Sequence, residues 1–205
     1  MRTLIAAFVV SALSFGTAHA QEAGTVGGGR VEFGAFPVGG LFFGHYTGNS
    51  PNFSNYALGT GLTVNLNRWF AVEGEFGGGL GRRQEMQHNG VVLSNQQSPS
   101  MLAYNGNVVV SVIGSDRAIS PYVAGGIGAL TLLTNADVTN LGIVNNETYL
   151  TGNAGGGLKW YATRHIGLRA DFRLFLVRNK DDAPFFSTTS NQYGARTYGG
   201  VFFTY

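Results

Sequence analysis

Charged and apolar side chains alternate along the segment IGLRADFRLFLV, which covers residues 166–177. Arg169, Asp171 and Arg173 stand at odd positions, and leucine, isoleucine, alanine and phenylalanine fill the even ones. A carboxylate between two guanidinium groups can form ion pairs, exchange protons or line a path for ions. Because successive side chains of a β-strand point to opposite faces, the three charges share one face of a strand. Their chemistry therefore depends on whether that face meets water or lies inside the protein.

Nine charged residues follow the same rule across the chain. Period-two alternation and turn signals predict eight strands, at 30–44, 55–66, 70–81, 101–113, 121–133, 149–162, 166–177 and 193–205. The strand at 121–133 has apolar residues or glycine on both faces and does not discriminate between them. In the other strands every charge lies on the phase opposite the large apolar side chains. These charges are Arg30, Glu32, Glu73, Glu75, Lys159, Arg169, Asp171, Arg173 and Arg196.

The charged face has the composition of a closed interior. Its five basic and four acidic groups nearly cancel, as ions without access to water must. Glycine, alanine, asparagine and threonine fill the rest of this face, and they suit the narrow lumen of an eight-stranded barrel. Aromatic residues near strand ends, such as Phe70 and Trp160, suit interfacial girdles on the opposite face. We predict a packed ion network inside a membrane barrel; the alternative is a narrow conducting pore.

Residues for catalysis or metal binding are sparse. A barrel enzyme that processes lipids would need a histidine, a serine and an acid close together. His45 with Ser54, or His88 with Glu85, offers part of such a set, and solvated loops are the preferred interpretation. Asp181-Asp182 is interpreted as a solvated loop tip, and no histidine pair has the spacing of metal ligands. We expect no catalytic residue, metal or cofactor, and keep a lipid-modifying enzyme as a remote alternative.

The first twenty residues, MRTLIAAFVVSALSFGTAHA, predict a secretory signal peptide. Arg2 precedes an apolar run that is too short for a membrane-spanning helix, and Ala18 and Ala20 form the small-x-small cleavage site. Residues 21–29 are then a glycine-rich periplasmic segment, and residues 30–205 form the barrel. The chain has no cysteine, so no disulfide supports the exported protein. The 13 basic and 11 acidic residues exclude the strongly basic surface that nucleic acid would favour.

The segments between the predicted strands alternate in length. Those at 67–69, 114–120 and 163–165 are short, and those at 45–54, 82–100, 134–148 and 178–192 are long. Tight periplasmic turns and longer external loops are typical of an outer-membrane barrel, which places both termini in the periplasm. The long loops carry the aromatic residues Phe53, Phe185 and Phe186, which we expect to be exposed and available to an external ligand.

Three segments resemble the small outer-membrane β-barrel family, which includes the membrane domain of OmpA and the protein OmpX. They are PYVAGGIGAL (121–130), GGGLKWYATRHIGLRADFR (155–173) and YGGVFFTY (198–205). The resemblance covers residues 30–205 and implies an outer-membrane location. It further implies that Tyr198, Gly200, Phe203 and Tyr205 form the C-terminal insertion signal, in which Tyr205 replaces the usual phenylalanine. We do not extend the resemblance to the peptidoglycan-binding domain of full-length OmpA-type proteins, so anchoring to the cell wall is not expected.

We therefore predict an all-β, eight-stranded, antiparallel, up-and-down barrel in the outer membrane. Its expected role is structural or in surface interaction, with the interior filled by charges. The expected partners are outer-membrane lipids, the barrel-assembly machinery and periplasmic chaperones during biogenesis, and an external ligand at the long loops.

Overall fold

Residues 166–177 form β9 (Ile166–Val177), with the bounds that the alternation predicts. Along β9 each exposed residue is followed by a buried one, from Ile166 outside to Val177 inside. Leu168 is 45% exposed and Phe172 is 49% exposed, whereas Arg173 is fully buried. The apolar face of this strand therefore points out of the protein and the charged face points in, as a membrane barrel requires.

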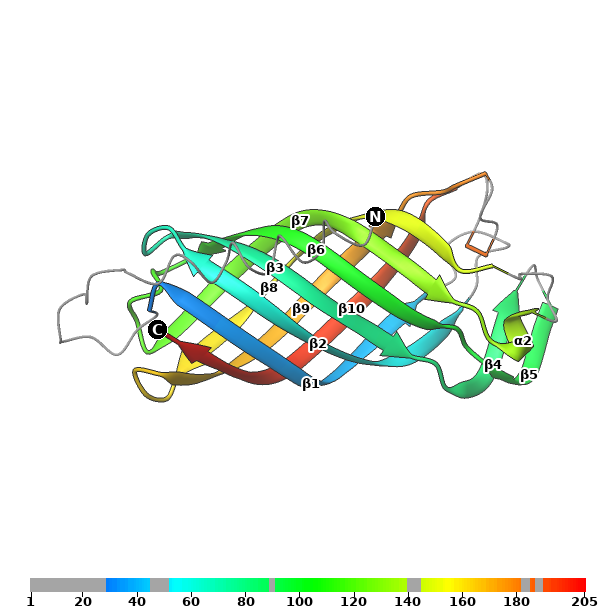
Figure 1. The fold of residues 1–205 in the computed structure, drawn as a ribbon, viewed down its shortest axis with the longest axis horizontal. Coiled ribbons are helices and arrows are strands. Elements are labelled where there is room, and N and C mark those ends of the chain that lie inside the picture. The colour runs from blue at the N-terminus through cyan, green and yellow to red at the C-terminus, as the bar shows by residue number, and fades with distance from the viewer. Residues whose placement is uncertain (1–28, 45–51, 89–90, 140–144, 182–184, 187–189) are drawn as a thin grey trace, which may run out of the picture.

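The computed structural model describes residues 29–44, 52–88, 91–139, 145–181, 185–186 and 190–205. Their long strands close into a barrel in the order β1-β10-β9-β8-β7-β6-β3-β2, with every pair antiparallel (Figure 1). The predicted fold is thus confirmed. The strands of the wall are β1 (Val31–Phe43), β2 (Phe53–Asn65), β3 (Phe70–Leu80), β6 (Ser100–Ser111), β7 (Ile119–Leu133), β8 (Glu147–Tyr161), β9 and β10 (Gln192–Thr204).

The two ends of the barrel differ. The short connections 66–69, 112–118 and 162–165 lie at one end together with the C-terminus, on the left of Figure 1. The long connections lie at the other end. The described residues contain no helix with the length and hydropathy to cross a membrane. The predicted signal peptide, with Ala18 and Ala20, lies outside the described residues.

The segment predicted as a loop at 82–100 contains a second sheet, which corrects the expectation. Strands β4 (Arg83–His88) and β5 (Val91–Gln97) form a hairpin beyond the barrel wall, beside the short helix α2 (Ala136–Thr139). Hydrogen bonds fix the base of the hairpin: Gln84 Nε2 donates to Ser98 Oγ at 3.0 Å, and Ser98 Oγ donates to Asn55 Oδ1 at 2.6 Å. The base of the hairpin, which connects β3 to β6, is therefore attached to β2.

Strand β1 carries a β-bulge around Pro37 that the sequence pattern did not predict. The pairing with β10 shifts by one residue between Ala35 and Val38, and the pairing with β2 shifts between Phe36 and Gly40. Proline has no backbone N–H to give to a ladder, so it is tolerated at such a break. The extra residue reverses the faces of the strand, and Leu41 is buried although its odd number predicts the outer face.

Candidate functional site

Eight of the nine predicted interior charges lie inside the barrel. Each is no more than 5% exposed, and they are Glu32, Glu73, Glu75, Lys159, Arg169, Asp171, Arg173 and Arg196. Arg30 is the correction: it precedes the first residue of β1 and its side chain is exposed. Without Arg30 the buried set holds four basic and four acidic groups, so its formal charge is zero.

One ion pair lies in the lumen near the short turns. Lys159 Nζ on β8 lies 2.5 Å from Glu32 Oε2 on β1. The other carboxylate oxygen of Glu32 accepts hydrogen bonds from Tyr161 Oη at 2.8 Å and Asn65 Nδ2 at 2.9 Å. Because a buried carboxylate is costly without partners, these three donors stabilise Glu32 in place.

Two arginines of β9 hold the centre of the lumen. Arg173 contacts Glu73 at 2.7 Å and Asp171 at 3.0 Å, and its Nη1 donates to Asn153 at 3.2 Å. Arg169 pairs with Glu73 as well and lies 2.9 Å from Asp171. Glu73 comes from β3, on the far side of the barrel from β9. The network therefore crosses the lumen and does not merely line its wall.

The last ion pair joins β3 to β10. Arg196 Nη2 donates to Glu75 Oε2 at 2.8 Å, and a second contact joins Nη1 to Oε1. The Arg196 guanidinium also lies over the Tyr198 ring, with its carbon 4.0 Å from the ring centroid. A bidentate pair stacked on an aromatic face is one of the stronger ways to hold a buried arginine.

Tyr122 belongs to this network and was missed by sequence reasoning. Its hydroxyl donates to Asp171 Oδ2 at 2.6 Å and accepts from Arg169 Nε at 2.7 Å. The apolar residues of the segment 121–133 do not separate its two faces, yet in the structure Ser120, Tyr122 and Ala124 are buried. Ile119 and Val123, which alternate with them, are exposed. A lone tyrosine among small residues was the signal for an inward polar group.

Aromatic rings form the next layer toward the long loops. Phe36 stacks on Tyr198 with ring centroids 5.5 Å apart and an interplanar angle of 13°. The lumen has room for Tyr198 because the facing positions on β2 and β3 are glycines: a Cβ at Gly77 would lie 2.3 Å from the Tyr198 hydroxyl, and one at Gly59 would lie 2.8 Å from it. Gly77 therefore makes space for an aromatic ring inside the barrel.

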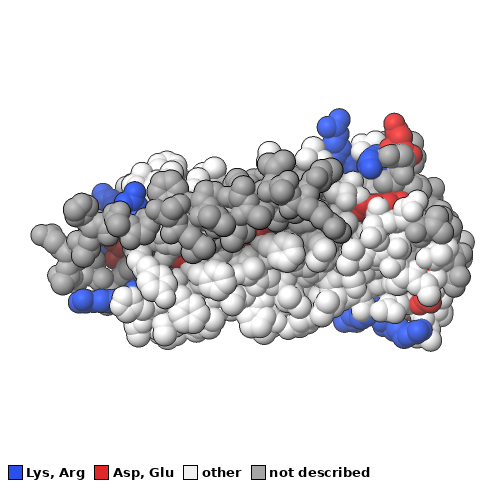
Figure 2. All heavy atoms as spheres, in the orientation of Figure 1, with Lys and Arg blue, Asp and Glu red and all other residues white. Residues whose placement is uncertain are grey.

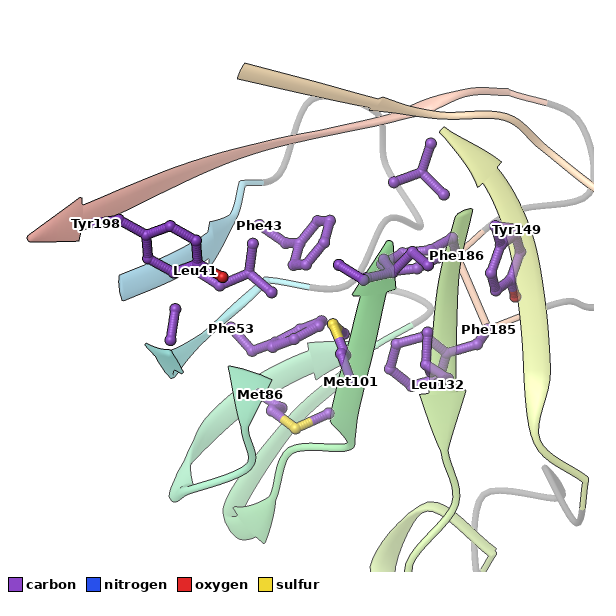
Figure 3. Close-up of a cluster of buried hydrophobic side chains, with 14 of the residues drawn as sticks. Leu41, Phe43, Phe53, Met86, Met101, Leu132, Tyr149, Phe185, Phe186 and Tyr198 are labelled. Carbon is purple, nitrogen blue, oxygen red and sulfur yellow. The ribbon is translucent and has the colours of Figure 1, made fainter. Parts of the chain in front are cut away.

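A cluster of apolar side chains closes the end of the lumen at the long loops (Figure 3). Phe185 and Phe186, expected to be exposed, are 0% and 2% exposed, and Phe53 is 3% exposed. Phe186 packs against Phe43 of β1 at 4.9 Å and against Tyr149 of β8 at 5.1 Å, so its ring bridges the lumen. Phe53 is the first residue of β2 and faces the lumen, two positions before the predicted start of that strand. Phe185 and Phe186 lie outside the strands, so no strand period reveals their burial.

Polar contacts hold Phe185 and Phe186 in the lumen. Phe185 N donates to Glu147 Oε2 at 3.3 Å, and the same oxygen accepts from the Tyr149 hydroxyl. Glu147 is 8% exposed and lies in a segment predicted to be loop. The first residue of β8 thus anchors Phe185 at this end of the lumen.

One cavity within the barrel is small. Between the ion network and the apolar cluster lies a cavity of about 10 Å³, lined by residues that include Leu41, Phe175 and Tyr198. A void of this size is at the lower limit for a single water molecule. The acids and bases are joined to one another across the lumen, so the arrangement is suited to holding the barrel closed.

The catalytic candidates from the loops do not assemble among the described residues. His45, Asp182 and the side chain of His88 lie outside them. Ser54 hydrogen-bonds to Gln84 through its backbone and side chain, and no histidine takes part in those bonds. Asp181 is exposed, and the described residues contain no group of three potential metal ligands.

The C-terminal residues of the predicted insertion signal lie on β10 and just beyond it. Tyr198 faces the lumen, whereas Phe203 is 40% exposed and Tyr205 is 80% exposed on the outside. A Cβ at Gly200 would lie 2.1 Å from the carbonyl oxygen of Ala35, so the close pairing of β1 and β10 requires glycine there. Recognition of these residues during insertion remains a prediction.

Several solved structures share this architecture, and a search of curated proteins found no match. The N-terminal β-barrel domain of Pseudomonas aeruginosa OprF is 16% identical, with 86% of this chain and 98% of that chain covered and a TM-score of 0.50. Neisserial surface protein A is 12% identical, with 87% of this chain and 99% of that chain covered and a TM-score of 0.54. OprG from Pseudomonas aeruginosa is 11% identical, with 88% of this chain and 98% of that chain covered and a TM-score of 0.55. At these identities the likeness shows the fold alone.

A family model agrees with the structural likeness. It describes an outer membrane protein beta-barrel domain and matches residues 8–198. The matched range contains the first seven strands of the wall and half of β10. With its closed eight-stranded wall and apolar outer face, the chain belongs to the outer membrane protein beta-barrel family.

Proposed function

We propose that this protein is a non-conducting, non-catalytic outer-membrane barrel with a structural and surface-interaction role. The observation that carries the proposal is the closure of the lumen at two separate levels. Arg173 and Glu73 join opposite walls near the centre, and Phe186 joins β1 to β8 near the long loops. An ion crossing the barrel would have to break a buried ion pair and displace an apolar ring, and each step is costly.

The surface at the long loops supports the interaction part of the proposal. A groove of about 800 Å³ lies there, lined by residues of β1, β2, β4, β9 and β10 that include Phe42, Met86 and Tyr193. Hydrogen bonds from Gln84 and Ser98 to β2 hold the hairpin side of the groove against the barrel. A preformed, mostly apolar groove with a few polar groups is what an external ligand requires.

Planar-bilayer recording of refolded protein tests the closure. We expect no single-channel steps from the wild type. We also expect none from the double variant Phe185→Ala/Phe186→Ala, because its ion network still blocks the lumen. A porin recorded in the same bilayers provides the positive control. Stable and reproducible steps from the wild type would overturn the proposal in favour of a narrow pore.

A further inference from the structure

Four exposed arginines lie at the short-turn end of the barrel. We call them the rim arginines: Arg30, Arg68, Arg117 and Arg164. Each short turn contributes one, and Arg30 precedes β1 at the same end. Asp116 is the one acidic residue in the described segments 29–30, 66–69, 112–118 and 162–165. Figure 2 shows blue patches at this end of the molecule, on the left, beyond a white middle.

The opposite end has no such excess of one sign. Its exposed or half-buried charges beyond the barrel wall are mixed, and the described ones are Arg82, Arg83, Glu85, Asp137, Arg178, Lys180 and Asp181. Figure 2 accordingly shows both red and blue on the right. The short-turn end is therefore the basic end of the barrel.

The rim arginines are held on ordered turns. Asn67 Oδ1 accepts from the backbone N–H groups of Trp69 and Phe70 at 2.8 and 2.9 Å, which fixes the turn around Arg68. Ser115 N donates to the Arg68 carbonyl oxygen at 2.8 Å and thereby joins two neighbouring turns. A third turn is fixed in the same way by Thr163, whose Oγ1 accepts from Ile166 N at 3.0 Å.

Each rim arginine stands directly beside the apolar belt. The nearest exposed apolar residues are one to three positions away: Phe33 for Arg30, Trp69 for Arg68, Ile119 for Arg117 and Ile166 for Arg164. The Arg68 guanidinium lies over the Trp69 ring, with its carbon 5.0 Å from the centroid. Arginine can lay its apolar stem on such a belt and place its charge at the level of lipid headgroups. Among the described residues no acidic group forms an ion pair with any rim arginine.

We propose that the rim arginines bind the phosphate groups of anionic phospholipids in the leaflet next to the short turns. Short turns of outer-membrane barrels face the periplasm, so this is the periplasmic leaflet. Basic residues at a membrane surface attract anionic lipid within about a Debye length. The protein would then carry a shell enriched in acidic phospholipid at one end only. The inference is independent of whether the lumen conducts.

The two tryptophans of the chain make a direct test possible. Trp69 and Trp160 are 39% and 48% exposed and both lie at the short-turn end, so tryptophan fluorescence reports on this leaflet alone. The protein is refolded into vesicles of phosphatidylcholine and phosphatidylglycerol in which one of the two lipids carries bromine near the headgroup. Bromine quenches tryptophan fluorescence. Comparing the quenching in vesicles with brominated phosphatidylcholine and in vesicles with brominated phosphatidylglycerol therefore gives the lipid composition beside the rim arginines.

For the wild type at low salt we expect phosphatidylglycerol to be enriched over the bulk mixture by at least about threefold. The enrichment should disappear in a variant with glutamine at all four rim positions. It should also disappear for the wild type in 1 M NaCl, where the Debye length is about 3 Å. Heat-modifiable migration shows that each variant is folded, and the salt series gives the answer if the fourfold variant does not fold.

The matched control replaces the three arginines of the other end, as Arg82→Gln/Arg83→Gln/Arg178→Gln, and should leave the enrichment unchanged. Equal quenching by the two brominated lipids around the wild type would overturn the inference. So would an enrichment that survives the four rim substitutions in a folded protein, or one that the control variant abolishes.

Discussion

Arg173 shows at the scale of one residue how the interior holds the barrel together. It is fully buried, and it contacts Glu73, Asp171 and Asn153 while lying 3.8 Å from Glu75. Carboxylates from two strands therefore depend on one guanidinium. A buried ion pair of this kind gives little net stability against a well-packed apolar pair, but removing one partner leaves an uncompensated charge.

We predict that Arg173→Leu lowers the free energy of unfolding by roughly 3–5 kcal/mol. Adding Glu73→Gln to Arg173→Leu should restore part of the loss, because the lumen regains its charge balance. Urea unfolding in vesicles, followed by tryptophan fluorescence, measures Arg173→Leu, Glu73→Gln and the double variant. A double variant that loses as much as its two single changes added together would contradict the coupling across the lumen.

The β1 bulge shows at the scale of one element how a break in the ladder survives in the membrane. Pro37 has no paired residue in either neighbouring strand. Its carbonyl oxygen accepts a hydrogen bond from the Tyr56 hydroxyl, and the Thr60 hydroxyl donates to the Gly34 oxygen at 2.7 Å. Hydrocarbon offers no water to replace such partners, so these outward hydroxyl groups have a structural task.

Tyr56→Phe should therefore destabilise the barrel by about 1–3 kcal/mol, because it leaves the Pro37 oxygen without this donor. Tyr104→Phe is the matched control. Tyr104 is 41% exposed and Tyr56 is 44% exposed, but the partner of Tyr104 is Thr131, which also contacts the Thr148 hydroxyl at 2.9 Å. Loss of the Tyr104 hydroxyl should lower the free energy of unfolding by about 0.6 kcal/mol. Equal losses in the same urea experiment would show that the bulge does not depend on Tyr56.

The elements also show what the sequence could and could not predict. Strict alternation predicted the first and last residues of β9, because the apolar and charged positions of this strand differ so strongly. Alternation failed at Leu41, where a bulge reverses the phase, and at Tyr122, where both faces looked alike. It gave no sign of the β4–β5 hairpin, whose strands are short and mostly polar. The burial of Phe186 could not be predicted from the sequence, because Phe186 lies outside the strands and no strand period applies to it.

The whole molecule depends on the pairing of its first and last strands. β10 pairs with β1 from Glu32–Thr204 to Phe43–Gly194, and with β9 along its length. The end of this seam is fixed further by Val31 N, which donates to the Tyr205 carbonyl oxygen at 3.1 Å, and by Tyr205 N, which donates to the Val31 oxygen at 2.9 Å. Without these bonds two strands would present unpaired backbone groups to hydrocarbon.

Deletion of residues 203–205 should accordingly leave an exported chain that does not insert and remains sensitive to trypsin. The deletion shortens the ladder between β10 and β1, and it removes the exposed rings of Phe203 and Tyr205 from the girdle. Replacing residues 87–95 by a short linker is the control, since this segment lies beyond the wall and the change keeps Gln84 and Ser98 in place. Trypsin protection in outer-membrane fractions compares the two variants. The closing seam is essential only if the truncated chain is digested while the control is protected; equal protection would show that the barrel closes without the last three residues.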